Sequence, residues 1–257
     1  MKFFDSHAHL TSDALYPSID NYVERAQNHS LAHIINICTD LTTLERGLKL
    51  SKEHPWIYNT AATTPHDVDK WGEEHFETIA QAARDKKLIG VGETGLDYYY
   101  EHSPRKLQQD FCVRYLHLAQ ECSLPVVIHC RDAFSDLWSL IDQEYKSSLE
   151  IPGILHCFTG NQKEAFEVID RNFMISFSGI MTFKKSTELR DIAKSIPLEH
   201  ILIETDSPYL APQSMRGKTN EPAFIAETAE CLAKIKEIPL EEVAEVTYQN
   251  AKRVFRL

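Results

Sequence analysis

Eight short apolar segments with strand character recur along the chain, and the segments between them repeat apolar residues at helical spacing. The strand-like segments span about 3–7, 33–38, 57–62, 88–92, 125–129, 153–157, 173–178 and 201–205. Strand followed by helix, repeated eight times, predicts parallel pairing with right-handed crossovers. This pattern predicts an α/β fold of the (β/α)8 TIM-barrel type, and a doubly wound open sheet is the alternative.

Two helix starts carry recognisable signals. Asn161 followed by Glu164 has the spacing of a capping box, and Ser103-Pro104 is typical of an N-cap followed by the first helical residue. The length of 257 residues suits one barrel, which typically needs about 250, so we expect a single domain over residues 1–257. A hydrophobic fraction of 43% is enough for a large core.

Potential metal ligands stand at the ends of the strand-like segments. His7 and His9 are two residues apart in Asp5-Ser6-His7-Ala8-His9, so on an extended chain both imidazoles lie on one face. Four further candidates each follow an apolar segment: Glu93, His129, His156 and Asp206. Barrel enzymes carry their catalytic groups at the carboxyl ends of the strands, where these six residues are predicted to lie. Imidazole and carboxylate together are ligands for zinc, manganese, nickel or cobalt, and a bridging carboxylate can join two ions.

The formal net charge of −11 argues against a protein that coats nucleic acid with a broad basic surface. It leaves room for local binding, because divalent ions in a cleft would attract a phosphodiester despite the acidic exterior. The amino-terminal residues lack the pattern of a signal peptide, and no apolar stretch approaches membrane-spanning length, so we expect a cytoplasmic protein without membrane contact.

Six cysteines are spread along the chain without Cys-x-x-Cys spacing, which favours reduced thiols. Cys130 and Cys157 each follow a candidate ligand histidine. In a strand they would point to the opposite face, so we predict that both pack against the outer helices.

Several segments together resemble the TatD family of metal-dependent hydrolases, often called TatD-type deoxyribonucleases, and the resemblance covers essentially the whole chain. They are Asp5-Ser6-His7-Ala8-His9, Gly92-Glu93-Thr94-Gly95-Leu96-Asp97, His129-Cys130-Arg131-Asp132-Ala133, His156-Cys157-Phe158-Thr159-Gly160, Glu204-Thr205-Asp206-Ser207-Pro208-Tyr209-Leu210 and Arg216-Gly217-Lys218-x-Asn220-Glu221-Pro222. The intact His-x-His motif and the run ending in Tyr98-Tyr99-Tyr100 are more similar to the YcfH-like branch than to TatD itself.

The resemblance implies a distorted, amidohydrolase-like barrel that binds two divalent ions and hydrolyses phosphodiester bonds in DNA. The ions would be Mg, Mn, Zn, Ni or Co. Their ligands would be His7, His9, Glu93, His129, His156 and Asp206, and every one of these positions is filled here. One position departs from the family, since Thr64 replaces the histidine usual in a Gly-x-His-Pro motif at the third strand. His66 could take over part of that role in binding substrate.

We expect His7 and His9 to hold one ion and His129 and His156 the other, with Glu93 as the bridge. Asp206 would bind an ion and accept the proton of the attacking water. Glu204 is either a hydrogen-bond partner of a ligand or a polar plug of the barrel. Arg131 and Arg216 are candidate phosphate contacts, although Arg131 could instead pair with Asp132, and Arg216, with Lys184, Lys185 and Lys218, could be solvated loop charge.

Three functions remain open at this point. The first is a metal-dependent deoxyribonuclease, removing nucleotides from a single-stranded 3′ end. The second is hydrolysis of a carbonyl substrate such as an amide, lactone or ester, including aminoacyl-tRNA, because similar ligands activate water against carbonyl carbon. The third is a metal-binding scaffold without activity. The absence of an inserted lysine that could be carbamylated favours Glu93 as the bridge, and we expect a monomer. Tyr98, Tyr99 and Tyr100 could stack on bases, but packing is the favoured role for at least one of them.

Overall fold

All eight predicted strands are present in the computed structural model, which describes residues 1–257, and they form one parallel sheet. Their bounds are β1 (Phe3–Ala8), β2 (Leu31–Cys38), β3 (Ile57–Ala61), β4 (Gly90–Asp97), β5 (Val126–Arg131), β6 (Gly153–Leu155), β7 (Met174–Phe177) and β8 (Ile201–Ile203). Each strand pairs with the next one along the chain, from β1 to β8. This order confirms the barrel and excludes the doubly wound alternative, in which the strand order reverses.

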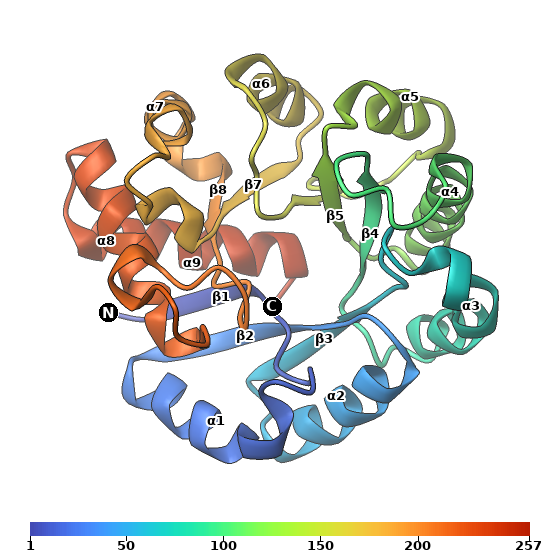
Figure 1. Cartoon of the computed structure of the whole chain (residues 1–257), viewed down its shortest axis with the longest axis horizontal. Coiled ribbons are helices and arrows are strands. Elements are labelled where there is room, and N and C mark those ends of the chain that lie inside the picture. The colour runs from blue at the N-terminus through green and yellow to red at the C-terminus, as the bar shows by residue number, and fades with distance from the viewer.

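The helices form a ring outside the strands (Figure 1). They are α1 (Ile19–Asn28), α2 (Leu41–Glu53), α3 (Val68–Arg84), α4 (Arg105–Cys122), α5 (Phe134–Glu144), α6 (Gln162–Asp170), α7 (Thr187–Ser195), α8 (Ile225–Lys236) and α9 (Leu240–Phe255). Short 3-10 turns are η1 (Tyr16–Ser18), η2 (Gly179–Thr182), η3 (Leu198–His200), η4 (Gln213–Met215) and η5 (Pro222–Phe224). None of the helices has the length and apolar character required to cross a bilayer.

The barrel is distorted and not fully closed, because β8 is short and the pairing of β1 is irregular after Asp5. No ladder joins β8 to β1. Instead, the backbone N–H of Asp206 donates to the carbonyl of His7 at 2.9 Å, and that of His9 donates to the carbonyl of Ser207 at 2.7 Å. This seam holds the segment that follows β8 directly against the two imidazoles at the end of β1.

Alternation along the strands separates two apolar clusters. The larger one packs strands against helices, and the smaller one, in which α9 takes part, fills the barrel interior. The interior cluster includes Phe4, Ile35, Ile37, Val127, Ile154, Met174, Leu202 and Phe255. His129 follows Val127 by two residues, and His156 follows Ile154 by two, so both imidazoles continue the inward face beyond the apolar layer.

Capping agrees with the sequence at one helix and differs at another. Asn161 and Glu164 form the predicted capping box of α6, with each side chain bonded to the other's backbone N–H. Ser103 does not cap α4, which begins at Arg105 with Pro104 as its N-cap. The Ser103 hydroxyl instead donates to the carbonyl of His66 at 2.9 Å, which ties the loop before α4 to the loop after β3.

Candidate metal centre

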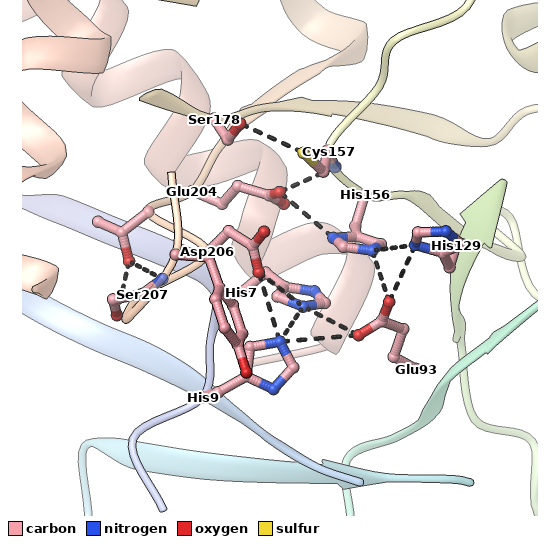
Figure 2. Close-up of polar contacts among 12 residues, drawn as sticks. His7, His9, Glu93, His129, His156, Cys157, Ser178, Glu204, Asp206 and Ser207 are labelled. Carbon is pink, nitrogen blue, oxygen red and sulfur yellow. Dashed lines mark hydrogen bonds and ion pairs between the residues drawn. The ribbon is translucent and has the colours of Figure 1, made fainter. Parts of the chain in front are cut away.

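The six predicted ligands converge at the carboxyl ends of the strands (Figure 2). His7 and His9 come from the end of β1, Glu93 from β4, His129 from β5, and His156 and Asp206 from the segments that follow β6 and β8. Five of the six line a cavity of about 580 Å³, and His7 is fully buried behind them. The sequence therefore located this cluster although its members are up to 199 positions apart (206 minus 7).

Glu93 lies at the centre of the cluster and faces a different histidine pair with each carboxylate oxygen. Its Oε1 is 2.9 Å from Nε2 of His156 and 3.1 Å from Nδ1 of His129. Its Oε2 is 3.5 Å from Nε2 of His7 and 3.7 Å from Nε2 of His9. This is the arrangement expected of a carboxylate that bridges two cations.

Asp206 completes the half of the cluster that contains His7 and His9. Its Oδ1 lies 3.4 Å from Nε2 of His9 and 3.6 Å from Nε2 of His7. The backbone of Asp206 is left-handed, with a φ of 56°, a conformation that aspartate and asparagine tolerate better than most residues. The turn directs the carboxylate into the cavity, where it is 7% exposed.

The donor set fits divalent cations on the evidence of its own contacts. Ring nitrogens of His7 and His9 face each other at 3.2 Å, and those of His129 and His156 do so at 3.3 Å. Facing imidazole nitrogens repel unless a proton or a cation lies between their lone pairs. With two carboxylates alongside, each histidine pair offers nitrogen and oxygen ligands of the kind that transition metals prefer.

Two further buried carboxylates lie beside His129 and His156, the histidines of the other half of the cluster. Asp97 Oδ2 accepts a hydrogen bond from Nε2 of His129 at 2.9 Å, and Glu204 Oε1 lies 3.4 Å from Nδ1 of His156. Glu204 also accepts the backbone N–H of Cys157 at 2.8 Å. Of the two roles considered for Glu204, these contacts favour that of a partner that orients a ligand.

The charges of the cluster are strongly coupled. Burial alone would raise the pKa of Glu93, but His156, His129 and His7 lower it well below its ordinary value. Burial alone would lower the pKa of His156, but Glu93 and Glu204 raise it well above its ordinary value. Without metal, the carboxylates therefore favour protons on His9, His129 and His156 by raising their pKa, whereas burial lowers the pKa of His7.

This coupling predicts opposite pH responses with and without metal. In the metal-free protein, the raised pKa of His156 stabilises the fold at pH values below about 6.5, the ordinary pKa of histidine in the unfolded chain. This stabilisation is lost as the pH rises from there through the raised pKa of His156 in the folded protein. Metal ions compete with the same protons, so the stabilisation by metal should grow with pH. We expect the Tm difference between Mn²⁺-loaded and chelated protein to increase from about pH 6 to about pH 8.5 in thermal melts. A Tm difference that is constant or shrinks over this range would contradict this account of the cluster.

Arg131 lies at the cavity wall without an acidic partner. Its guanidinium carbon is 3.9 Å from the ring centre of Tyr99 and 5.0 Å from that of Tyr100, and no carboxylate lies within ion-pair distance of it. The alternative pairing with Asp132 is therefore wrong, because the charge of Arg131 rests on aromatic faces instead. A guanidinium held in this way keeps its N–H groups available to an anion in the cavity.

The other predicted substrate contacts divide between the cavity and the surface. His66 and Thr64 both line the cavity, and the His66 ring lies edge-on to that of His129 with the centroids 5.4 Å apart. Arg216 is exposed, stacks on Phe183 at 4.4 Å and does not line the cavity. Among the tyrosines, Tyr98 is packed, and its hydroxyl donates to Asp136.

Cys130 and Cys157 behave differently. Cys130 belongs to the helix-facing apolar cluster, as predicted, and it also borders the cavity. The prediction for Cys157 is wrong, because β6 ends at Leu155 and the backbone of Cys157 is left-handed, with a φ of 43°. Its thiol lies 3.3 Å from the hydroxyl of Ser178 at the cavity (Figure 2). Strand alternation does not apply once the strand has ended.

Sequence reasoning assigned no role to Asp97 or Tyr209. Asp97 is four residues after Glu93 in β4, so the period of two that linked His7 to His9 could have placed it on the same face. Burial alone would raise the pKa of Asp97, but hydrogen bonds from His129 and from the backbone N–H of Tyr100 lower it to about 2. Tyr209, by contrast, carries no sequence signal, since its place beside His9 depends on the turn at Asp206.

Comparison with known proteins decides the family. Residues 4–256 match the sequence profile described as TatD related DNase. The chain belongs to the TatD family. It is 36% identical to the uncharacterized metal-dependent hydrolase YabD of Bacillus subtilis, and the match covers 99% of both chains. It is 34% identical to the uncharacterized metal-dependent hydrolase YcfH of Escherichia coli, over 100% of this chain and 97% of that protein.

A further TatD-family relative is a Salmonella typhimurium protein named 3′-5′ ssDNA/RNA exonuclease TatD, 31% identical with 99% of both chains covered. Among solved structures, the Escherichia coli TatD homolog YJJV superposes with a TM-score of 0.92 at 25% identity, covering 99% of this chain and 98% of that one. An uncharacterized amidohydrolase from Saccharomyces cerevisiae superposes with a TM-score of 0.82 at 16% identity, covering 99% of both chains. The TatD-family protein described here is thus a metal-dependent hydrolase with an amidohydrolase-like barrel.

Proposed function

We propose that this protein is a metal-dependent exonuclease that removes nucleotides from the 3′ end of single-stranded DNA. The observation that carries the proposal is the position of Glu93, with one carboxylate oxygen toward His129 and His156 and the other toward His7 and His9. Two divalent ions held by these residues and Asp206 would lower the pKa of water toward about 7 and offset charge on the phosphoryl oxygens. The exonuclease name of the Salmonella relative supports phosphodiester bonds as the substrate.

The roles of the residues follow from their places in the cavity. Glu93 holds the two halves of the site together, and Asp206 accepts the proton of the attacking water. Arg131 and His66, which also line the cavity, bind the phosphate, and no protein nucleophile is required. Arg216, on the loop after β8, contacts the strand outside the cavity.

The cavity favours a single strand over a duplex. The ligating atoms are deep, since the Glu93 side chain is 7% exposed and that of His7 is fully buried. A phosphodiester must enter the cavity to reach them, and a free strand end is thin and flexible enough to do so. With a net charge of −11, the rest of the surface adds little affinity for DNA. We therefore expect the protein to contact only a short stretch of the strand and to depend on metal for binding. We place this activity in the cytoplasm, in a monomeric enzyme.

A cleavage assay tests the proposal. Protein stripped with chelator is supplied in turn with Mg²⁺, Mn²⁺ or Zn²⁺ and incubated with a 5′-labelled single-stranded oligonucleotide or with the same sequence as a closed circle. We expect a metal-dependent ladder of shortened products from the linear strand and no cleavage of the circle. No cleavage with any metal, by protein shown to bind two ions, would contradict the proposal and favour a carbonyl substrate.

A further inference from the structure

Asp97 is buried at the end of β4 and touches both the candidate metal centre and the cavity wall beside it. Its Oδ2 accepts the hydrogen bond from His129 at 2.9 Å. Its Oδ1 accepts two backbone N–H groups, from Tyr99 at 3.0 Å and Tyr100 at 2.7 Å. We propose that Asp97 is a positioning residue that orients His129 as a metal ligand and fixes the turn after β4, whose Tyr99 and Tyr100 rings flank the Arg131 guanidinium. This inference rests on the proposed function.

Asp97 acts on His129 by fixing the ring's tautomer. When Nε2 donates its proton to the carboxylate, Nδ1 is left with a free lone pair. This Nδ1 atom faces Glu93 Oε1 at 3.1 Å, within the candidate metal centre. A carboxylate behind a ligating histidine also raises the basicity of the ring, and losing such a partner typically costs 10–100-fold in metal affinity.

Asp97 acts on the cavity wall through the two backbone bonds. They hold the turn after β4 so that the rings of Tyr99 and Tyr100 lie beside Arg131. Both tyrosines are more than half exposed, so the packing of their rings alone does not fix their positions. Gln108 of α4 also holds the backbone of Asp97, since its side chain forms hydrogen bonds with both the N–H and the carbonyl of that residue.

Counting donors shows why a carboxylate is required here. Both oxygens of Asp97 accept from N–H donors, Oδ2 from the His129 imidazole and Oδ1 from two backbone groups. Nε2 of His66 also lies 3.6 Å from Oδ2, beyond hydrogen-bond distance. An asparagine has a single oxygen, so its NH₂ group would face either His129 or the two backbone N–H groups. The first arrangement places the wrong tautomer in the metal centre, and the second opposes donor with donor in the turn.

Glu204 offers a matched comparison, because it lies beside His156 but accepts hydrogen bonds with only one of its two oxygens. Its Oε1 accepts from Cys157 and lies near His156, whereas its Oε2 is buried without a hydrogen-bond partner. A glutamine can keep its oxygen at the Oε1 position and lose no existing bond. We therefore expect Glu204→Gln to be much milder than Asp97→Asn, although both remove one buried charge.

Calorimetry with Mn²⁺ tests the inference on chelator-stripped wild type, Asp97→Asn, Glu204→Gln and the exposed control Asp191→Asn. Wild type and Asp191→Asn should bind two ions, and Asp97→Asn should bind one of them 10–100-fold more weakly or lose it. Glu204→Gln should change both affinities by less than about tenfold. Equal Mn²⁺ binding by Asp97→Asn and wild type, or an equal loss in the two variants, would overturn the inference. A wild type that binds no Mn²⁺ would instead refute the proposed function.

The cavity wall is tested separately through DNA hydrolysis. Asp97→Asn should raise KM as well as lower kcat, because it loosens the turn whose tyrosines pack against Arg131. The double variant Tyr99→Leu/Tyr100→Leu should keep two Mn²⁺ ions and raise KM several-fold with little change in kcat. An unchanged KM in the double variant would overturn this half of the inference.

A measurement on the wild type covers the case in which Asp97→Asn does not fold. Long-range ¹H–¹⁵N correlation spectra of the protein loaded with diamagnetic Zn²⁺ distinguish the two imidazole tautomers. His129 should carry its proton on Nε2. A proton on Nδ1 would overturn the role of Asp97.

Discussion

Replacing Glu93 with glutamine is expected to abolish DNA hydrolysis, with a fall in kcat of about 10³-fold or more. The amide NH₂ must replace one of the two carboxylate oxygens, so it faces either the pair His129 and His156 or the pair His7 and His9. That half of the site gains a donor where a cation needs an acceptor. Mn²⁺ binding, measured by equilibrium dialysis, should fall from two ions per chain to one or none.

Glu199 provides the control for this substitution. It is exposed in η3, which precedes β8, so it lies at the end of the strand opposite the candidate metal centre. Glu199→Gln should keep two ions and the wild-type rate. If Glu93→Gln also bound two ions and cleaved DNA at more than about a tenth of the wild-type rate, Glu93 would not be the bridge.

Replacing Asp206 with asparagine should lower kcat by about 10²–10⁴-fold and change KM by less than about threefold. Asparagine fits the left-handed backbone of this position as well as aspartate does, so the turn should survive. The amide cannot accept a proton from water, whereas the phosphate contacts of Arg131 and His66 remain in place. Steady-state kinetics on a single-stranded oligonucleotide separate the two parameters.

Asp191→Asn, an exposed substitution on α7, makes the same chemical change away from the cavity and should leave both parameters unchanged. A rise in KM without a fall in kcat would assign Asp206 to substrate binding rather than proton transfer. Equal activity of Asp206→Asn and wild type would remove it from the mechanism altogether.

The barrel and the convergence of the six candidate ligands could be predicted from the sequence because both depend on where the strands begin and end. Short apolar runs located the eight strands, and the carboxyl ends of parallel strands meet at one end of a barrel. His129 and His156 therefore had to lie near each other once their strands were placed. Six motif segments spread along the chain indicated the family, which the profile match confirms.

The parts that could not be predicted depend on the loops that follow the strands, where the period of two no longer applies. Cys157 turned toward the cavity because its backbone is left-handed. Arg131 stacked on tyrosines rather than pairing with Asp132, a choice that depends on the turn held by Asp97. These contacts join residues through loop geometry, which hydrophobic patterning does not specify.

Anomalous diffraction from crystals soaked in Mn²⁺ tests most directly the claim that Glu93 bridges two ions. We expect two peaks on either side of its carboxylate, one within ligand distance of His7, His9 and Asp206 and the other within ligand distance of His129 and His156. A single peak, or peaks that do not contact Glu93, would contradict the two-ion centre on which the proposed hydrolysis depends.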